Sequence, residues 1–364
     1  MNEAERAFVL KNFSEYYQKA EISVPSIEQR EFGIGGFQKK IEARHMGFPN
    51  NGALKNYLIG NTPLYISHSI AYYKYPEATP MENKEWGGGD LVFDLDMHAG
   101  MFMKKEEIEK VRNDAISLIE QLQADFGIKK EEMTVVFSGG RGFHIHVRSP
   151  EYRMLGGDER REIADYLGGI GLDYRKFFGR IDRYKIAGPK RTDWGYRGRL
   201  CKLVEKTLQE RPQLIHGRLK KEEEAAKLRS CMEDGNWSKT TISDIVERLE
   251  EVAEGLKVDT INVDAGVTID TKRLIRVPNT LHGSTGLAAR TLKTLEGFNP
   301  YNDAVAFGDE PVKIKAVLDI PEQEFSNKTM EKMKKEEEKE VPKSYAIYLI
   351  LKGAAVISSR AAYR

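Results

Sequence analysis

Strand-forming patterns occupy two separate stretches of this 364-residue chain, and a long block without them lies between the two. Residues 31–150 contain short strand-like runs punctuated by glycine and proline, and strand patterning returns from 258 to about 320. Helical, charge-rich segments dominate from 150 to about 255. We therefore predict one α/β unit interrupted by a helical insertion, rather than two domains in series.

The predicted division follows these changes of pattern. Residues 1–150 and 256–325 form a discontinuous α/β unit, and residues 151–255 form a mainly helical insertion. Residues 326–343 are almost all polar or charged, which is typical of a solvated helix or a linker. We expect 326–364 to be this charged linker followed by a small C-terminal element.

Composition excludes several classes of protein. The hydrophobic fraction of 40% and the charged fraction of 31% describe a soluble globular chain. Two cysteines are too few for a disulfide scaffold or a four-cysteine zinc site. The longest apolar run, 345–357, is too short to span a bilayer, and the charged N-terminus has no signal core. We therefore expect a cytoplasmic protein in a reducing compartment.

The strongest local signal is LVFDLDMH at residues 91–98. Because side chains alternate along a strand, Asp94 and Asp96 share one face, about 7 Å apart. Paired carboxylates repel each other unless a cation lies between them, and oxygen ligands suit Mg²⁺ or Mn²⁺. The pair alone leaves two readings equally open, a metal site or an edge strand with a solvated acidic face.

A second signal is TVVFSGGRGFHIHVRS at 134–149, which predicts a hairpin with its turn at 138–142. Glycines at positive φ let backbone N–H groups converge on an anion, and Ser138 and Arg141 add phosphate donors. His144 and His146 share one strand face. A plain turn, structural imidazoles and half of a transition-metal site remain alternatives at this stage.

The third signal is residues 263–286, VDAGVTIDTKRLIRVPNTLHGSTG. Asp264 and Asp270 lie on a strand-like stretch and at its end, and a basic segment and a polar loop follow. Residues that can contact phosphate are Lys272, Arg273, Arg276, His282, Ser284 and Thr285. A strand with an ordinary polar turn is the alternative.

Together the three segments supply carboxylates, a glycine-rich turn and a cationic cluster. This combination suits phosphoryl or nucleotidyl transfer with two metal ions. A P-loop is excluded because the chain has no G-x-x-x-x-G-K-[ST] sequence. A dinucleotide fingerprint is also excluded, because the glycines of the turn lie between two strands and do not open a helix.

These segments resemble, in order, the motifs of the small catalytic subunit of archaeal and eukaryotic DNA primases, and the archaeal form most closely. The third segment is similar to the corresponding family motif almost end to end. The similar segments are REFGIGG at 30–36, RHMGF at 44–48, WGGGDLVFDLDMH from Trp86, SGGRGFHIHV from Ser138, VDAGVTIDTKRLIRVPNTLHGSTGL from Val263 and VPKSYAIYLILKGAA from Val341.

The resemblance implies a prim fold, an RRM-like sheet core with an added N-terminal unit and a helical subdomain between the second and third motifs. Asp94, Asp96 and Asp264 would hold two catalytic Mg²⁺ or Mn²⁺ ions. Glu31 and Arg44 would lie near the site. The residues implied to bind the triphosphate are Ser138, Arg141, His144, Arg276 and His282.

The implied function is DNA-templated synthesis of short RNA primers from nucleoside triphosphates for DNA replication. The implied partners are single-stranded DNA and a large subunit that carries an iron–sulfur cluster, in a nucleoid-associated heterodimer. A repair or end-joining polymerase of the same superfamily is the nearer alternative. A non-catalytic RRM-like nucleic-acid-binding protein is the more distant one, because carboxylates on its sheet would repel phosphate.

The chain departs from the family pattern at two places. Gly140 stands where the family usually has arginine, so one phosphate contact is lost or supplied elsewhere. The family usually carries a zinc knuckle after the first motif, but this chain has no cysteine before Cys201. We therefore expect no structural zinc.

The formal net charge of +1 argues against a nucleic-acid partner only if charge is spread evenly. Residues 173–202 contain ten basic and three acidic residues, interleaved with six aromatic ones. Such a segment is typical of a track for single-stranded nucleic acid. An ordinary basic surface with core aromatics is the alternative, and binding by this chain alone is expected to be weak and salt-dependent.

Overall fold

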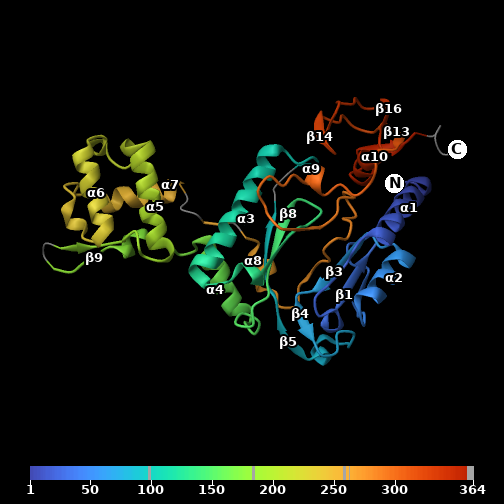
Figure 1. Ribbon diagram of the computed structural model, residues 1–364, viewed down its shortest axis with the longest axis horizontal. Helices are drawn as coiled ribbons and strands as arrows, with labels where there is room; N and C mark the ends of the chain where they lie inside the picture. The colour runs from blue at the N-terminus through green and yellow to red at the C-terminus, as the bar shows by residue number, and fades with distance from the viewer. Residues whose placement is uncertain (97–99, 183–184, 257–259, 262, 359–364) are drawn as a thin grey trace. The chain divides into compact units, whose positions relative to one another are not determined.

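The computed structural model (Figure 1) describes residues 1–96, 100–182, 185–256, 260–261 and 263–358. The chain divides into two compact units. The first comprises Met1–Ile116, Lys130–Glu162 and Val263–Arg364, and the second comprises Ser117–Lys129 and Ile163–Asn262. The mixed α/β class is confirmed, whereas the prim fold itself stays a prediction. Within the described residues, no helix combines the length and the apolar character that crossing a bilayer requires.

The first unit begins with a helix and an antiparallel sheet. Helix α1 starts at a capping box, in which Asn2 and Glu5 bond each other's backbone N–H groups. The sheet has the strand order β11-β3-β1-β2, so β11, from the third motif, joins strands of the N-terminal region. The bounds are α1 Glu3–Lys19, α2 Asn51–Asn61, β1 Phe32–Gly35, β2 Ala43–Met46, β3 Tyr65–Ser69 and β11 Leu274–Arg276.

A second antiparallel sheet of the same unit has the order β12-β7-β8-β6. Its register places Asp94 opposite His144 and Val92 opposite His146. The predicted first-motif strand and the predicted hairpin are confirmed, and Met97 and His98 of the LVFDLDMH segment lie outside the described residues. The bounds are β6 Leu91–Asp96, β7 Met133–Phe137, β8 Gly142–Val147 and β12 Arg290–Leu292.

The two faces of this second sheet are covered differently. On one face the rings of Phe137, Phe143 and Phe298 pack together, with centroids 5.4 to 5.9 Å apart. On the other face Val92 is buried in a cluster with Ile275 and two more aliphatic residues, Ile70 and Val267. This apolar contact covers the start of β6 and leaves its Asp94–Asp96 end accessible.

The start of β6 is fixed by a buried network around Asp90, which is 2% exposed. Its carboxylate accepts from the Tyr72 hydroxyl at 2.5 Å and pairs with Arg30 at 3.1 Å and Arg148 at 3.2 Å. The Arg160 guanidinium donates to the Asp90 carbonyl at 2.8 Å. Four partners thus hold the residue that precedes the carboxylate strand.

The predicted return of strand patterning from 258 onward is wrong around Asp264. Asp264 caps a short helix, α8, because its carboxylate accepts a hydrogen bond from the Gly266 N–H at 2.9 Å. Val267 then turns inward to the cluster around Val92, and β-branched residues tolerate a helix when that burial compensates. Helix α8 spans Ala265–Ile269, and only β11 continues the expected strand.

The prediction that 326–343 is a solvated helix or linker is also wrong. The segment supplies β15 and β16, and β16 pairs with β13 in a sheet of order β16-β13-β17. Lys313 pairs with Glu338 at 2.8 Å and Lys315 pairs with Glu336, so the charges of the two strands are matched by diagonal cross-strand ion pairs. The bounds are β13 Pro311–Ala316, β14 Gln323–Phe325, β15 Lys328–Met330, β16 Glu338–Pro342 and β17 Ala355–Ile357.

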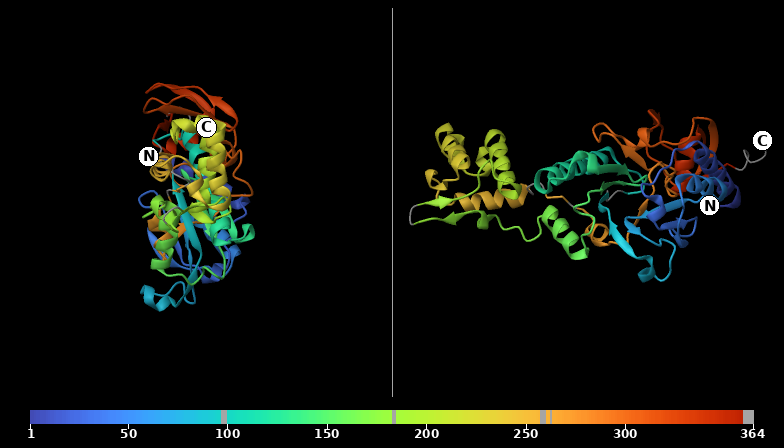
Figure 2. Two further views of the ribbon diagram at one scale, coloured as in Figure 1. Left: turned by 90° about the vertical axis from the view of Figure 1, so that its left-hand side faces the viewer. Right: turned by 60° about the horizontal axis from the view of Figure 1, so that its bottom comes forward.

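Helix α10, Lys343–Leu351, follows β16 and is buried from Ser344 to Ile350. Both views in Figures 1 and 2 show this part of the chain, coloured red, beside α1. The rings of Phe13 and Phe307 meet there at 6.0 Å. The C-terminal part of the chain is therefore integrated into the first unit rather than appended to it.

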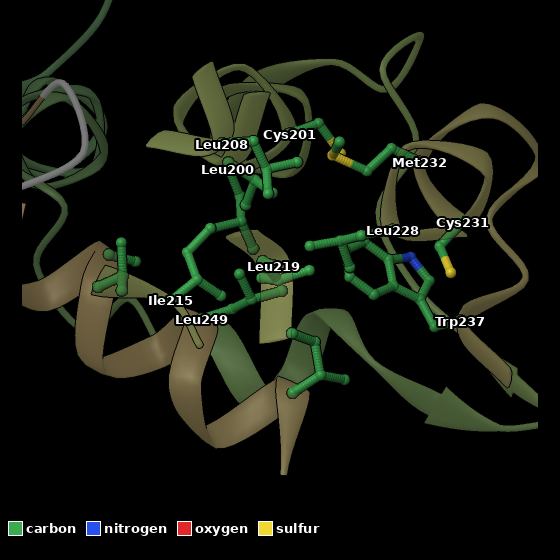
Figure 3. Close-up of a cluster of buried hydrophobic side chains, with 14 of the residues drawn as sticks. Leu200, Cys201, Leu208, Ile215, Leu219, Leu228, Cys231, Met232, Trp237 and Leu249 are labelled. Atoms are coloured by element: carbon green, nitrogen blue, oxygen red, sulfur yellow. The ribbon is translucent and has the colours of Figure 1, made fainter. Parts of the chain in front are cut away.

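The second unit is mainly helical and has its own core (Figure 3). Trp237 and Leu228 are buried together with both cysteines, Cys201 and Cys231. Its main helices are α5 Gly195–Glu210, α6 Glu222–Asp234 and α7 Ile245–Leu256, with a short pair of strands, β9 Gly179–Arg180 and β10 Ile186–Ala187.

The remaining elements are short or shared between the units. Helices α3 and α4 each contribute residues to both units, and α9 is a single turn. Their bounds are α3 Lys105–Phe126, α4 Gly157–Gly168 and α9 Pro300–Asp303, with β4 Ala71–Tyr73 pairing β5 Trp86–Gly89. The 3₁₀ turns are η1 Ile27–Gln29, η2 Met81–Lys84, η3 Lys130–Glu132, η4 Tyr174–Phe177, η5 Pro212–Leu214, η6 Gly217–Lys220 and η7 Trp237–Lys239.

Candidate active site

A cavity of about 590 Å³ opens in the first unit, where the ends of β6 and β8 meet β11 and the 279–286 loop. It brings together eight of the site residues that the family resemblance implies. These are Arg44, Asp94, Asp96, Ser138, Arg141, His144, Arg276 and His282. Asp264 does not line the cavity but is tied to it, since its N–H donates to the Asp94 carbonyl at 2.9 Å.

The carboxylates form an electrostatically strained group. Burial, and after it the charges of Asp96 and Asp264, raise the pKa of Asp94 to about 7 against a smaller opposite effect of Arg273. A carboxyl group beside two like charges is costly to ionise. The arrangement therefore favours a bound cation, which would remove the repulsion.

The three carboxylates Asp94, Asp96 and Asp264 supply oxygen ligands, which suit a hard divalent cation. Asp94 and Asp96 point from one strand face, and Asp264 follows from the adjacent chain. In the described part of the chain, no three His, Cys, Asp or Glu side chains already stand as a formed metal site. One oxygen of Asp264 is engaged as the α8 cap, so the pair on β6 offers the free ligands.

His144 lies directly across from Asp94 in the sheet, with its Nε2 3.7 Å from Oδ1 of the carboxylate. Burial, assisted by the charges of Arg276 and Arg273, lowers the pKa of His144 to about 3. The imidazole is therefore neutral at physiological pH, and the pair is not a salt bridge. A neutral ring beside the carboxylates is suited to donate one hydrogen bond to a phosphate oxygen.

His146 is buried behind this site and does not line the cavity. Its ring stacks on His68 with centroids 6.2 Å apart, and burial lowers its pKa well below the usual value. The His-x-His pattern thus splits into one side chain at the cavity and one in the interior.

The glycine-rich turn differs in detail from the expected anion nest. The N–H groups of Gly140 and Gly142 both donate to Oγ of Ser138 at 3.2 Å. These two donors are therefore directed at the serine, and the hydroxyl organises the turn. Gly139 has φ of 75°, and its carbonyl accepts from the Thr285 hydroxyl at 2.6 Å, which ties the turn to the third motif.

Gly140, the departure from the family pattern, lies against His282. A Cβ atom at position 140 would come within 3.2 Å of His282 Nε2. The imidazole thus occupies the space next to the backbone, and a larger side chain at 140 would require the ring to shift.

The orientation of His282 is set by its own loop. The Ser284 N–H donates to Nδ1 at 3.3 Å, so Nε2 carries the proton in the neutral ring. Burial lowers the pKa of His282 well below its usual value, and the charges of Arg276, Lys40 and Lys352 add to the effect. The ring therefore stays neutral, with Nε2 as the donor.

Arg276 supplies a buried positive charge. Its guanidinium lies 5.3 Å from the centroid of the Tyr65 ring, and its Nη1 is buried without a hydrogen-bond partner. Burial lowers the pKa of Arg276 to about 10, which still leaves it charged at neutral pH. A buried, unpaired guanidinium nitrogen at a cavity wall marks an anion-binding position.

Glu31 and Arg44 have different positions. Arg44 lines the cavity, and its Nε donates to Oε1 of Glu31 at 2.7 Å while its Nη2 donates to the Lys272 carbonyl at 3.2 Å. Glu31 is fully buried and also faces Lys84 at 3.7 Å. Glu31 thus fixes Arg44 from behind.

Three polar cavity residues were not singled out from the sequence: Lys40, Ser67 and Lys352. Ser67 is on β3, where the strand pattern carries no chemical signal. Lys352 lies in the VPKSYAIYLILKGAA segment, which resembled the family, but none of its residues stood out by type or spacing. Only the fold brings these side chains to the cavity.

Several basic side chains of segment 173–202, in the second unit, form ion pairs with nearby carboxylates. Arg191 pairs with Glu205 at 2.5 Å, Arg197 pairs with Asp193 at 2.8 Å, and Arg199 pairs with the buried Asp125. Trp194, in contrast, is 80% exposed. Several cations are thus matched within the unit, and the nucleic-acid track remains a prediction.

Comparison with known proteins gives a consistent result. The family described as DNA primase small subunit matches residues 93–294, which include Asp94 and Asp96 of the first motif and the whole of the second and third motifs. The DNA primase small subunit PriS of Methanococcoides burtonii is 33% identical, over 96% of this chain and 97% of its own length. PriS of Archaeoglobus fulgidus is 34% identical, over 97% of this chain and 99% of its own. The chain belongs to the DNA primase small subunit family.

Proposed function

We propose that this chain is the catalytic subunit of a primase, which synthesises short RNA primers from nucleoside triphosphates on a DNA template. The observation that carries the proposal is one cavity lined both by carboxylates, Asp94 and Asp96, and by a cationic wall around Arg276. A metal–triphosphate complex has the matching distribution of charge.

The carboxylates would bind two Mg²⁺ or Mn²⁺ ions through Asp94, Asp96 and Asp264. When bound, such ions lower the pKa of a 3′-hydroxyl and neutralise charge on the transferred and departing phosphates. The protein residues position these ligands: the sheet register aligns Asp94 with His144, and the Asp264 N–H fixes the Asp94 backbone.

The cationic wall would bind the phosphates of the incoming nucleotide. Nε2 of His282 and the unpartnered Nη1 of Arg276 are donors for phosphate oxygens, and Arg141 adds charge from the turn. Because the side chains of Arg276 and His282 are buried and fixed in place, little reorganisation accompanies the reaction. Ser138 would act mainly by shaping the turn.

The name "small subunit" of the relatives implies a large partner subunit. We propose that this chain assembles with such a subunit, one that carries an iron–sulfur cluster, and acts with it on single-stranded DNA. Initiation requires two free nucleotides to be held together, and a second subunit would reduce that entropic cost.

Synthesis on unprimed single-stranded DNA tests the proposal. Labelled ribonucleotides should enter short products only with a divalent cation, and the large subunit should increase initiation. Extension of primed ends without any unprimed initiation, in the presence of the large subunit, would instead identify a repair or end-joining polymerase. Absence of incorporation under both conditions would exclude catalysis.

A further inference from the structure

One cation of the cavity comes from the C-terminal part of the chain. Lys352 directly follows α10, and its N–H donates to the Tyr348 carbonyl at 3.0 Å. The helix before it is buried along almost its whole length. Packing therefore fixes the Lys352 backbone at the cavity edge, and only the side chain has freedom to move.

The ammonium of Lys352 has a cationic and aromatic environment. It lies 5.7 Å from the centroid of the Tyr348 ring, and the positive charge of Arg141 acts on it. Among the described residues, no carboxylate lies within ion-pair distance of Lys352. A cavity-lining lysine without a carboxylate partner, on which a second positive charge acts, favours a bound anion.

The position of Lys352 along the cavity follows from which charges act on which groups. The charges of Asp96, Asp264 and Arg273 shift the pKa of Asp94. The charges of Arg276, Lys40 and Lys352 shift the pKa of His282. Lys352 is therefore at the His282 end of the cavity, where the charge of Arg141 also acts on it, and its charge is not among those that shift the pKa of Asp94. A nucleotide whose α-phosphate faces the carboxylates would direct its terminal phosphates to this end.

We propose that Lys352, together with Arg141, binds the terminal phosphates of the incoming nucleotide and makes the site select triphosphates over diphosphates. The inference rests on the proposed function, because it assumes that a nucleotide occupies this cavity. It adds a specificity residue from outside the three motifs.

The protonation of Lys352 gives this contact a distinct signature. Burial and the charge of Arg141 lower the pKa of Lys352 to about 8. Two groups near it do not titrate between pH 7 and 9, because burial raises the pKa of Tyr348 and lowers that of His282. A bound phosphate would raise the lysine pKa again, so triphosphate affinity should fall as pH rises through 8.

Calorimetric binding of Mg²⁺–ATP and Mg²⁺–ADP to the full chain tests the proposal. Lys352→Ala should weaken ATP binding about tenfold, as expected for one lost charge-assisted contact, and change ADP binding much less. Lys352→Arg should keep ATP affinity at pH 7 and, unlike the wild-type lysine, also at pH 9. Lys343→Ala is the matched control, because Lys343 starts the same helix but pairs with Glu310 outside the cavity.

The outcomes separate this inference from the proposed function. Unchanged ATP affinity in Lys352→Ala, or equal losses for ATP and ADP, would overturn the role of Lys352. Failure of the wild-type chain to bind ATP at all would instead count against the nucleotide site. If Lys352→Ala lowers the melting temperature, Lys352→Gln, which keeps most of the side-chain length, should reproduce the selective loss in a folded protein.

Discussion

Asp94 and His144 face each other across neighbouring antiparallel strands, with the carboxylate and the imidazole 3.7 Å apart. Both groups are shifted toward their neutral forms, the acid to a pKa of about 7 and the base to a pKa of about 3. Burial is the main cause in each case. A cation can therefore bind to the Asp94 carboxylate without repulsion from His144, because the imidazole is neutral.

Asp94→Asn should abolish nucleotide incorporation and stabilise the metal-free protein. The folded-state pKa of Asp94 is raised, so the destabilisation is absent below the unfolded pKa near 4 and complete above about pH 7. Its upper limit is about 4 kcal/mol by linkage. Thermal unfolding of wild type and variant, measured with chelator at pH 5 and pH 8, should show a variant advantage that grows with pH.

Added Mn²⁺ provides the matched comparison for this variant. It should raise the melting temperature of the wild type and have little effect on Asp94→Asn, because the ligand is gone. An equal Mn²⁺ effect in both proteins, or half the wild-type incorporation rate in the variant, would contradict the metal assignment.

Asp90→Ala should destabilise the first unit by about 3–5 kcal/mol, since it leaves Arg30 and other cationic partners buried without their counter-ion. Urea unfolding measures the change. Lys74→Ala is the control: it removes an ion pair with Glu85 in which both side chains are more than half exposed, and it should change stability far less than the loss of Asp90. Similar losses in the two variants would show that the network around Asp90 contributes little.

Gly142→Ala should disrupt the carboxylate strand. A Cβ atom at this position would overlap the Leu95 carbonyl and lie 3.0 Å from Cα of Asp96, so β8 would have to move away from β6. We expect the free energy of unfolding to fall by about 1–3 kcal/mol. We also expect the variant to lose activity under conditions in which it is still folded. Gly60→Ala, in a helix with open space around it, should leave both unchanged or slightly improve stability. Wild-type activity in Gly142→Ala would contradict this close approach.

Purified protein should contain no stoichiometric tightly bound zinc. The two cysteines are buried, and burial raises the pKa of Cys201 to about 12 and also raises that of Cys231, so neither is an accessible thiolate. Metal analysis after dialysis against chelator checks the expectation. One retained equivalent of zinc would require another set of ligands and would disprove it.

Local sequence patterns correctly predicted the strands in which apolar and polar side chains alternate between a buried and a more exposed face. The alternation in 91–96 and 133–147 identified β6 and the β7–β8 hairpin, because each strand has one apolar face. The strand prediction is wrong around Asp264, because an aspartate cap and the burial of Val267 produce a helix from strand-forming residues. Charge density in 326–343 concealed β16, whose glutamates are matched by lysines on a strand far away in sequence.

Some residues of the candidate site could likewise be predicted from the sequence, and others could not. Asp94, Arg276 and His282 could be selected from residue type and order, and they meet at one cavity. Lys352 could not, because its contribution depends on the packing of α10 rather than on any local pattern. The role expected of the glycine turn also changed, since Ser138 occupies two of its backbone donors.

Crystals of the chain grown with Mn²⁺ and a non-hydrolysable nucleoside triphosphate test the central claim most directly. Anomalous diffraction should place manganese beside Asp94 and Asp96, with the triphosphate running along the wall formed by Arg276 and His282. Manganese or triphosphate bound only outside this cavity would contradict the account.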